Sequence, residues 1–275
     1  MSTADRRARF RALHARPGIF LLPNPWDVGS ALLLQGAGFE ALATTSQGMA
    51  WCIGKRDTTV TRDELLAHVA MLAAAVEVPL AVDSERCFAD DPAGVAETVR
   101  LLGEAGAAGV SIEDYDPATD RIDAVDVAAA RVAAAARAAH GADSMVLTAR
   151  CENHLHGVDD LDDTIHRLLA YEAAGADCVY APGLRDPADI AAVIAAVRVP
   201  VNVLPIPGAP TIAELGALGA RRASTGSMLT SAAYGALMSA ARELQGPGTT
   251  TFTAAGLSDA DRDVFRGAGA VANPA

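Results

Sequence analysis

The sequence is poor in aromatic residues and in positive charge. Phe, Trp and Tyr make up 4% of its 275 residues, and 22 Lys and Arg stand against 34 Asp and Glu, a formal net charge of −12. Binding to nucleic acid or to an anionic membrane needs clustered positive charge, and single strands also need aromatic side chains for stacking. We therefore expect neither kind of partner.

Long apolar runs and paired cysteines are also missing. No stretch approaches the roughly 18 uninterrupted apolar residues of a membrane-spanning helix, and no long apolar run follows the basic N-terminal residues as in a signal peptide. The four cysteines, Cys52, Cys87, Cys151 and Cys178, show no C-x-x-C spacing. These absences predict a cytoplasmic protein with free thiols.

The sequence does contain eight short apolar runs that alternate with helix-like segments. In residues 104–113, for example, a helix ends in a glycine-bearing turn and an apolar run follows that closes on a polar residue. Eight such units predict one (β/α)8 TIM-type barrel domain over residues 1–245, with 246–275 as a C-terminal extension. A doubly wound sheet is the alternative, but residues 23–26 are unlike its glycine-rich first turn. The expected helices cover 26–37, 61–76, 92–107, 123–140, 159–175, 186–196, 211–219 and 228–245.

The polar residues at the strand ends are the candidates for chemistry, because barrel active sites lie at the C-terminal ends of the strands. Carboxylates with few nitrogen or sulfur ligands nearby favour a hard cation such as Mg²⁺ or Mn²⁺. Arginine suits a planar carboxylate or a phosphate. The strand ends, in chain order, are Asn24, Ser46, Asp83, Glu113, Arg150, Pro182, Asn202 and Thr225.

The acids at this rim have two interpretations. Asp83 and Glu85 lie two residues apart, so both point the same way if the strand geometry continues, and Glu113 follows on the next strand, roughly 4.8 Å across the sheet. They form either a metal-binding cluster or an ion-paired strand end, and Arg150 could form a salt bridge with one of them. Asp57, in the loop after the second strand, would alone be a solvated acid.

Three further parts of the rim are candidates for substrate contacts. Ser46-Gln47-Gly48 can offer backbone N–H groups to an oxyanion, or can be a plain turn. His156 belongs to an H-x-H pair, but no third zinc ligand stands at a telling spacing, so a substrate contact or supporting hydrogen bond is favoured. Trp26 follows the first strand and either walls the pocket or packs at its rim.

Six segments of the chain carry a family resemblance when they are taken together. They are Asn24-x-Trp26-Asp27-x-Gly29-Ser30, Thr44-Thr45-Ser46, Asp83-x-Glu85, Ser111-Ile112-Glu113-Asp114, Thr148-Ala149-Arg150-x-Glu152-Asn153 and Pro200-Val201-Asn202-Val203. No single segment is specific, but in this order, within about residues 17–243, they resemble the isocitrate lyase/phosphoenolpyruvate mutase superfamily. The nearest resemblance is to its phosphonomutase-like branch.

The resemblance implies a modified barrel whose eighth helix is exchanged between the subunits of a homodimer or homotetramer. It also implies Mg²⁺ at Asp83, with Glu85 and Glu113 reaching the ion directly or through water. The substrate would be a small carboxylate.

For catalysis, the resemblance implies an enolate-type pyruvate stabilised by the metal and by the backbone amides of residues 46–48. Arg150 would bind a carboxylate of the substrate or stabilise the charge that develops in the reaction. Glu113 would act beside it at the metal. Asn202 would bind a distal group of the substrate, and Asp57 matches the acid near the reacting carbon.

The chain also departs from the characterised lyases of this superfamily. Their mobile Lys-Lys/Arg-Cys-Gly-His loop is replaced by residues 115–121, their Asp-x-Asp metal pair is Asp-x-Glu, and a glycine-rich stretch is replaced by Arg86-Cys87. We expect a Mg²⁺-dependent carbon–carbon lyase or decarboxylase acting on a small 2-oxo or 2-hydroxy di- or tricarboxylic acid. The alternatives are a phosphonopyruvate-type P–C mutase or hydrolase, and a non-catalytic carboxylate-binding barrel.

Overall fold

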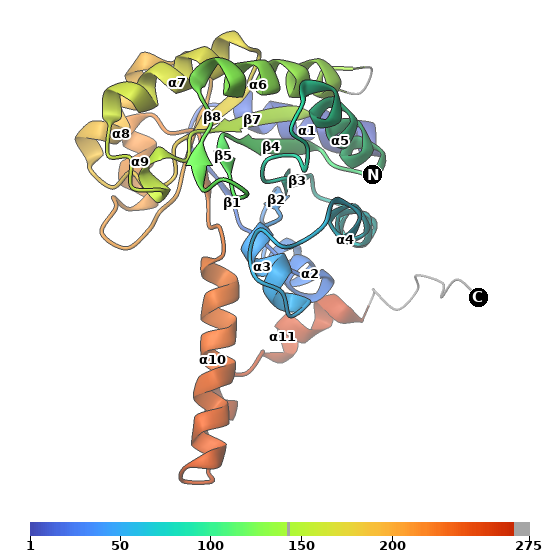
Figure 1. Cartoon of the computed structure of the whole chain (residues 1–275). Coiled ribbons are helices and arrows are strands. Elements are labelled where there is room, and N and C mark those ends of the chain that lie inside the picture. Colours follow the sequence, from blue (N-terminus) through green and yellow to red (C-terminus); the bar gives the residue numbers. More distant parts are fainter. Residues whose placement is uncertain (142–143, 267–275) are drawn as a thin grey trace.

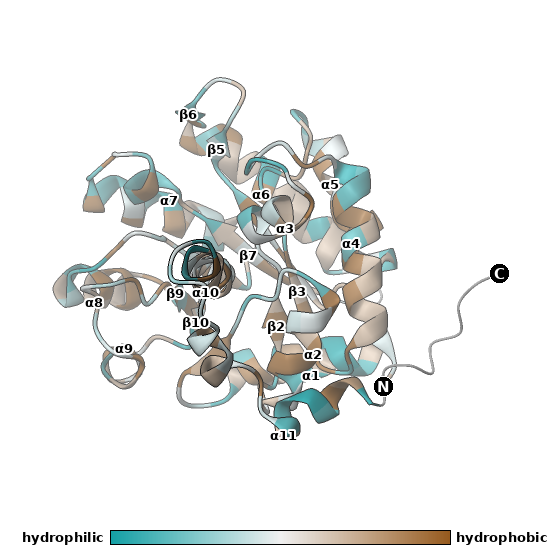
Figure 2. Cartoon of the chain, turned by 90° about the horizontal axis from the view of Figure 1, so that it is seen from below, coloured by the Kyte–Doolittle hydropathy of each residue, from teal (hydrophilic) through white to brown (hydrophobic). Residues whose placement is uncertain are grey.

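The computed structural model describes residues 1–141 and 144–266. Eight parallel strands form a nearly closed barrel with helices around it, which confirms the predicted (β/α)8 architecture (Figure 1, Figure 2). The hydrogen-bonded order is β1-β10-β9-β8-β7-β4-β3-β2, and the Ala43 N–H donates to the Pro23 carbonyl (3.1 Å) between the two outermost strands. The strands are β1 (Phe20–Leu22), β2 (Leu42–Ala43), β3 (Leu80–Asp83), β4 (Gly109–Glu113), β7 (Val146–Arg150), β8 (Cys178–Tyr180), β9 (Val201–Val203) and β10 (Arg222–Ser224).

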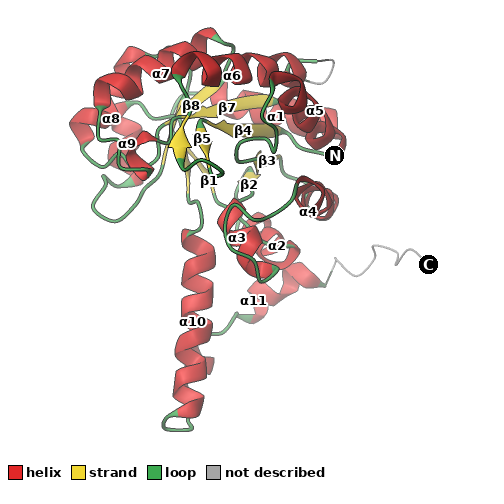
Figure 3. Cartoon of the chain, in the orientation of Figure 1, coloured by secondary structure: helices red, strands yellow, loops and turns green. Residues whose placement is uncertain are grey.

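Helices alternate with the strands around the barrel (Figure 3). Thr61 forms a capping box with Glu64 at the start of α4, and Asp91 caps α5 just before a proline. Each helix lies within the range predicted for it, and side-chain caps such as these fix several of the helix starts. They are α2 (Val28–Gly36), α4 (Arg62–Ala75), α5 (Pro92–Glu104), α6 (Val125–Ala139), α7 (Leu161–Ala173), α8 (Pro187–Ala196), α9 (Ile212–Leu218) and α10 (Met228–Gln245).

The N-terminal helix α1 (Thr3–Ala15) closes the N-terminal end of the barrel. Its Phe10 is fully buried in a cluster with Phe20 and Leu22 of β1 and several small alanines. Phe10 approaches β4 so closely that a Cβ atom on Gly109 would lie 2.7 Å from its Cε1 atom. Because this end is filled, the polar interior lies toward the other end of the strands.

Helix α1 thus plugs the N-terminal end of the barrel, and its His14 connects this plug helix to the barrel interior. Its ring packs edge-on against Phe10 (4.6 Å between centroids) and Phe20 (5.0 Å). Its Nδ1 lies 2.8 Å from the Phe10 carbonyl, to which it donates, so Nε2 is left to accept from Arg222 Nη1 at 3.2 Å. Burial, and then the charge of Arg222, lower the pKa of His14 to about 3. The ring is therefore neutral at physiological pH.

Two elements of the structure were not predicted. Residues 46–52 form a short helix, α3 (Ser46–Cys52), and not a plain turn, because the Thr45 side chain caps it by accepting from the Gly48 N–H. After β4 the chain forms a hairpin of β5 (Tyr115–Asp116) and β6 (Arg121–Ile122), whose tight turn the Asp116 side chain stabilises. Both lie beside the C-terminal ends of the strands.

Helix α10 projects away from the barrel, and the chain then returns toward α2 (Figure 1). The returning segment contains η2 (Thr251–Ala255), α11 (Asp259–Arg262) and η3 (Asp263–Phe265), and Val264 lies directly against Gly36 of α2. The division at residue 245 stays a prediction, and residues 267–275 lie outside the described residues. None of the helices within 1–141 and 144–266 is long and apolar enough to cross a membrane.

The neutral His14 predicts a loss of stability in mild acid. Between about pH 6.5 and pH 3 the unfolded chain binds a proton that the folded chain does not, so the free energy of unfolding falls as pH falls, by at most about 1.4 kcal/mol per pH unit. In His14→Gln this contribution should disappear, which urea unfolding at pH 7.5, 6 and 5 would measure. His166→Gln, which changes an exposed histidine of α7, is the control. Equal pH slopes for wild type and His14→Gln would contradict the assignment.

Candidate active site

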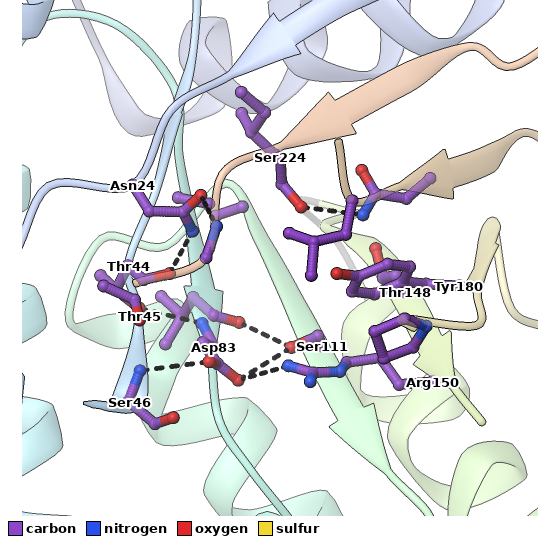
Figure 4. Close-up of a pocket in the computed structure, with 18 of the residues that line it drawn as sticks. Asn24, Thr44, Thr45, Ser46, Asp83, Ser111, Thr148, Arg150, Tyr180 and Ser224 are labelled. Atoms are coloured by element: carbon purple, nitrogen blue, oxygen red, sulfur yellow. Dashed lines mark hydrogen bonds and ion pairs between the residues drawn. The ribbon is translucent and has the colours of Figure 1, made fainter. Parts of the chain in front are cut away.

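A cavity of about 210 Å³ opens at the C-terminal ends of the strands (Figure 4). The structure brings six of the predicted site residues together in its wall: Ser46, Gln47, Asp57, Asp83, Arg150 and Asn202. The other predicted residues, Trp26, Gly48, Glu85, Glu113 and His156, lie outside this lining. Two strand ends, β3 and β7, supply Asp83 and Arg150, which form an ion pair in the cavity wall.

Asp83, at the end of β3, is held by donors on both carboxylate oxygens. Its Oδ2 accepts from the Ser46 N–H (3.1 Å) and its Oδ1 from Arg150 Nη1 (3.1 Å), while the Asp83 N–H donates to Thr44 Oγ1 (2.9 Å). Figure 4 shows the Asp83 carboxylate between Ser46 and Arg150. The carboxylate is therefore fixed in position.

Arg150, at the end of β7, is paired with three carboxylates. Its Nη1 lies 2.7 Å from Glu113 and 3.1 Å from Asp83, and its Nε lies 2.7 Å from Glu152. Desolvation lowers the pKa of Arg150, but the carboxylates, Glu113 foremost, outweigh it and raise the pKa well above its usual range. The salt-bridge interpretation of Arg150 is therefore confirmed, and its single charge is shared among three acids.

The acid cluster has more negative charge than Arg150 can balance. Burial, reinforced by Asp83 and Asp57, raises the pKa of Glu85 to about 8. Burial also raises the pKa of Glu113 well above its usual range, and burial and Asp83 raise that of Asp57. A buried surplus of negative charge favours either bound protons or a bound cation.

The turn after Asp83 adopts an unusual backbone conformation without glycine. Glu85, Cys87 and Phe88 have φ angles of 47°, 59° and 51°, in the left-handed region where side chains cost roughly 1–3 kcal/mol each. The buried Arg131 of α6 holds the turn by donating to the carbonyls of Arg86 (2.6 Å) and Asp90 (2.9 Å). The sequence indicated a less permissive backbone here, and the structure shows that the chain enters the left-handed region nonetheless.

Helix α3 presents the amides that the sequence singled out. The Ser46 N–H is used by Asp83, and the Gly48 N–H by the Thr45 cap (3.4 Å). The Gln47 side chain is fixed by the Ser227 hydroxyl, which donates to its Oε1. Of the three amides, that of Gln47 is the one without an acceptor among the described residues.

Trp26 and His156 contact other aromatic rings near the cavity. The Trp26 ring lies edge-on to Tyr234 of α10, with 6.4 Å between centroids. The His156 ring stacks on Tyr115 of the β5–β6 hairpin at 3.5 Å, and its neighbour Leu155 lines the cavity. Their roles in substrate binding stay predictions.

The remaining predicted strand ends lie at the rim. Asn24 accepts from the N–H groups of Thr225 (2.8 Å) and Gly226 (2.9 Å) and donates to the Thr44 carbonyl (2.7 Å). It therefore ties the ends of β1, β2 and β10 together. Pro182 is part of the cavity lining.

Sequence reasoning did not identify four inward residues that the structure places at the site: Tyr180, Arg222, Ser224 and Glu152. Tyr180, Arg222 and Ser224 line the cavity, and Arg150 lies over the Tyr180 ring (5.3 Å to the centroid). Tyr180 lies two residues before the predicted strand end Pro182, so counting back by the period of a strand could have found it. Arg222 lies three residues before the predicted end Thr225, so the same count misses it.

The acid cluster does not by itself enclose a metal ion. Over residues 1–141 and 144–266, no three His, Cys, Asp or Glu side chains are placed to hold an ion among them. Among the same residues, the H-x-H pair is not placed to hold an ion either. His154 instead contacts Thr164 (3.1 Å), and His156 stacks on Tyr115. A cation at Asp83 would therefore keep water molecules in its coordination shell.

Comparison with known proteins identifies clear relatives. Residues 10–245 match the family model described as phosphoenolpyruvate phosphomutase. A solved structure from Burkholderia cenocepacia, provisionally assigned as a lyase/mutase, is 51% identical, superposes with a TM-score of 0.91, and the match covers 96% of this chain and 95% of that one. An uncharacterized protein of Mycobacterium tuberculosis is 39% identical over 85% of this chain and 87% of its own length. An oxaloacetate decarboxylase of Paraburkholderia xenovorans is 32% identical over 76% and 72%.

Removal of the charge of Arg150 should destabilise the fold strongly. Arg150→Met would leave three buried carboxylates without their shared counter-charge, and we expect a loss of about 3–5 kcal/mol in the free energy of unfolding. Adding Glu152→Gln to this variant should restore part of the loss. Arg198→Met is the control, because its pair with Glu172 is exposed on the arginine side and such pairs contribute at most about 1 kcal/mol. Equal losses in urea unfolding for both arginine variants would refute the charge-balance account.

Proposed function

The chain belongs to the phosphoenolpyruvate phosphomutase family, and from this membership we propose a Mg²⁺-dependent carbon–carbon lyase or decarboxylase. Its superfamily, isocitrate lyase/phosphoenolpyruvate mutase, is the one that the sequence segments resembled, so that identification is confirmed. The proposed substrate is a small 2-oxo or 2-hydroxy di- or tricarboxylic acid, cleaved or decarboxylated through an enolate of the pyruvate type. The oxaloacetate decarboxylase among the relatives supports a substrate of this class.

The observation that carries the proposal is the fixed Asp83 carboxylate beside the start of α3 at the mouth of the cavity. Donors on both oxygens hold Asp83, and the free Gln47 amide lies one residue from Ser46, the residue that binds Asp83. An available backbone donor suits a reaction in which negative charge develops on a substrate oxygen, and the fixed acid beside it can hold a cation that stabilises the same charge. Asp57, also in the cavity wall, has a raised pKa and can exchange a proton near the reacting carbon.

The residues present fit a hydrated Mg²⁺. Mg²⁺ usually takes one or two carboxylates and keeps several waters, which suits Asp83 as a direct ligand with Glu85 and Glu113 behind it. The acids in this cluster outnumber Arg150, and a divalent cation would relieve their mutual repulsion, which adds to burial in raising the pKa of Glu85. Bound there, Mg²⁺ would stabilise the negative charge of the enolate oxygen.

Arg86 and Arg185 do not support P–C chemistry. Both follow strand-end residues in the sequence, Arg86 after Glu85 and Arg185 after Pro182, and are candidates to bind a phosphonate. Arg86 is instead committed to Asp123 (3.1 Å) and Asp90 (3.0 Å), and Arg185 is exposed, so neither belongs to the cavity lining. Neither arginine therefore supplies positive charge for a phosphonate in the cavity.

The projecting helix α10 supports a homodimer or homotetramer with exchange of this helix. Thr230 is its buried residue in the described chain, while Leu237, Met238 and Leu244 are exposed (64%, 49% and 52%). Figure 2 looks along the helix, and Figure 1 shows from the side that it extends away from the barrel. An apolar helix flank of this kind is stabilised when a second copy covers it. The acidic surface again argues against nucleic acid or membrane as partners.

We expect pyruvate release that depends on both Mg²⁺ and Asp83. The protein, with Mg²⁺ or with chelator, would be offered oxaloacetate, alkylmalates, 2-methylisocitrate and phosphonopyruvate in a coupled pyruvate assay. One carboxylic acid should give release that chelator abolishes, and Asp83→Asn should lower kcat/KM by at least about 100-fold, because the carboxylate proposed to bind Mg²⁺ directly is lost. Asp189→Asn, on the exposed start of α8, is the matched control.

The same assay separates the alternatives. Phosphate release from phosphonopyruvate alone would favour P–C chemistry. Silence across the panel together with no Mg²⁺ binding in calorimetry would favour a non-catalytic carboxylate-binding barrel and overturn the proposal.

The oligomer is tested by changing the exposed flank of α10. Light scattering should give a dimer or tetramer for the wild type and a lower mass for Leu237→Glu/Met238→Glu, because buried charges destabilise an apolar interface. Leu257→Glu, which changes an exposed apolar residue of the extension, should leave the mass unchanged. A monomeric wild type would exclude helix exchange.

A further inference from the structure

Two arginines line the cavity, and their surroundings differ in charge. Arg150 is paired with three carboxylates. Arg222, on β10, is 5% exposed and bonds three neutral acceptors: Asn202 Oδ1 (2.8 Å), Thr148 Oγ1 (3.0 Å) and His14 Nε2 (3.2 Å). No carboxylate in residues 1–141 and 144–266 forms a salt bridge with it. Arg222 is thus a buried charge without a protein counter-charge.

The register of the strands explains where this charge lies. Glu113, Arg150, Tyr180, Asn202 and Arg222 are partners in one row across β4, β7, β8, β9 and β10. Because the strands of a barrel are tilted against its axis, such a row runs from one level of the interior to another. Its β4 end lies in the acid cluster, and its β10 end reaches His14 of the plug helix α1. Arg222 therefore lies at the floor of the cavity, away from the acids at its mouth.

A buried arginine keeps its charge, since its pKa is too high for it to lose the proton. Burying a charge without a partner costs several kcal/mol. His14 does not alter this balance, because it is held neutral. The arrangement becomes favourable when an anion enters the cavity and supplies the missing counter-charge.

We propose that Arg222, Asn202 and Ser224 form an anion subsite at the cavity floor that binds a second acidic group of the substrate. The hydrogen bonds orient this subsite. Arg222 donates to Asn202 Oδ1, so the Asn202 amide nitrogen points to Ser224 Oγ, to which it donates at 2.9 Å. The Ser224 hydroxyl also forms a hydrogen bond with the Tyr180 hydroxyl, and both residues line the cavity (Figure 4).

The subsite deepens the proposed function and rests on it for the reacting end of the substrate. The acid cluster, which includes Asp83, would lie beside the 2-oxo or 2-hydroxy carboxylate end of the substrate. Arg222 at the floor favours the binding of a substrate with a second carboxylate, because a monocarboxylate would leave Arg222 unpaired. The substrate class that satisfies both ends is a dicarboxylic 2-oxo or 2-hydroxy acid.

The test compares two probes that differ only in the second carboxylate. Calorimetry on the full chain with Mg²⁺ would measure the Kd of lactate and of malate. Wild type should bind malate at least tenfold more tightly than lactate. Arg222→Met should reduce this ratio to about one while changing lactate affinity less than twofold, and Arg222→Lys should keep several-fold preference because it keeps the charge.

A second pair of variants keeps the test independent of folding. Ser224→Ala removes one donor and leaves Arg222 in place, so malate binding should weaken several-fold and lactate binding should not. Ser111→Ala removes a hydroxyl at the acid end, beside Asp83, and should affect both probes alike. The melting temperature of Arg222→Met without ligand should not fall, because an uncompensated charge has been removed.

Each outcome has a definite reading. Equal binding of malate and lactate by wild type, or equal weakening of both in Arg222→Met, would overturn the subsite. A malate preference that depends on Arg222, without pyruvate release in the substrate panel, would keep the subsite and reject the proposed reaction. Tighter binding of 3-phosphonolactate than malate, lost in Arg222→Met, would overturn the carboxylate as the group bound there.

Discussion

The interaction on which the site depends is the sharing of one guanidinium among three buried carboxylates. Parallel pairing of β4 with β7 sets Glu113 directly opposite Arg150, and the end of β3 brings Asp83 to the same group. Glu152 completes the set from the residues just after β7. One positive charge cannot balance three negative ones. The resulting repulsion adds to burial in raising the pKa values of Glu85 and Glu113, and a cation would be stabilised there.

The strained turn after Asp83 connects the acid cluster to the helices outside the barrel. Left-handed conformations at non-glycine residues persist only where surrounding structure enforces them. Here Arg131, buried in α6, holds the carbonyls of the turn, and Arg86 is anchored to Asp123 just before that helix. The direction of Glu85 is thus set by a helix that follows β4, not by its own strand. Packing on the outside of the barrel therefore controls an acid at its mouth.

The barrel and its mouth could be predicted from the sequence because both depend on local patterns. Eight apolar runs with caps and glycine turns gave the strands and helices, and reading the last residue of each strand found Asp83, Glu113 and Arg150. The floor could not be found this way. Arg222 lies two residues before its strand end, and its contact with His14 joins residues 208 positions apart through the register of a closed sheet. The α3 helix was also not predicted, since a seven-residue helix begun by one threonine cap resembles a turn in sequence.

The separation of charge along the cavity resolves how a protein of net charge −12 could bind a small anion. Its acids gather at the mouth, where they suit a cation, and the uncompensated Arg222 lies at the opposite end of the same row of residues. A ligand with a single acidic group can satisfy only one of these ends. Stability and function are then opposed at Arg222: the buried charge is unfavourable in the empty cavity and favourable once a second acidic group is present, as is common for residues kept for binding.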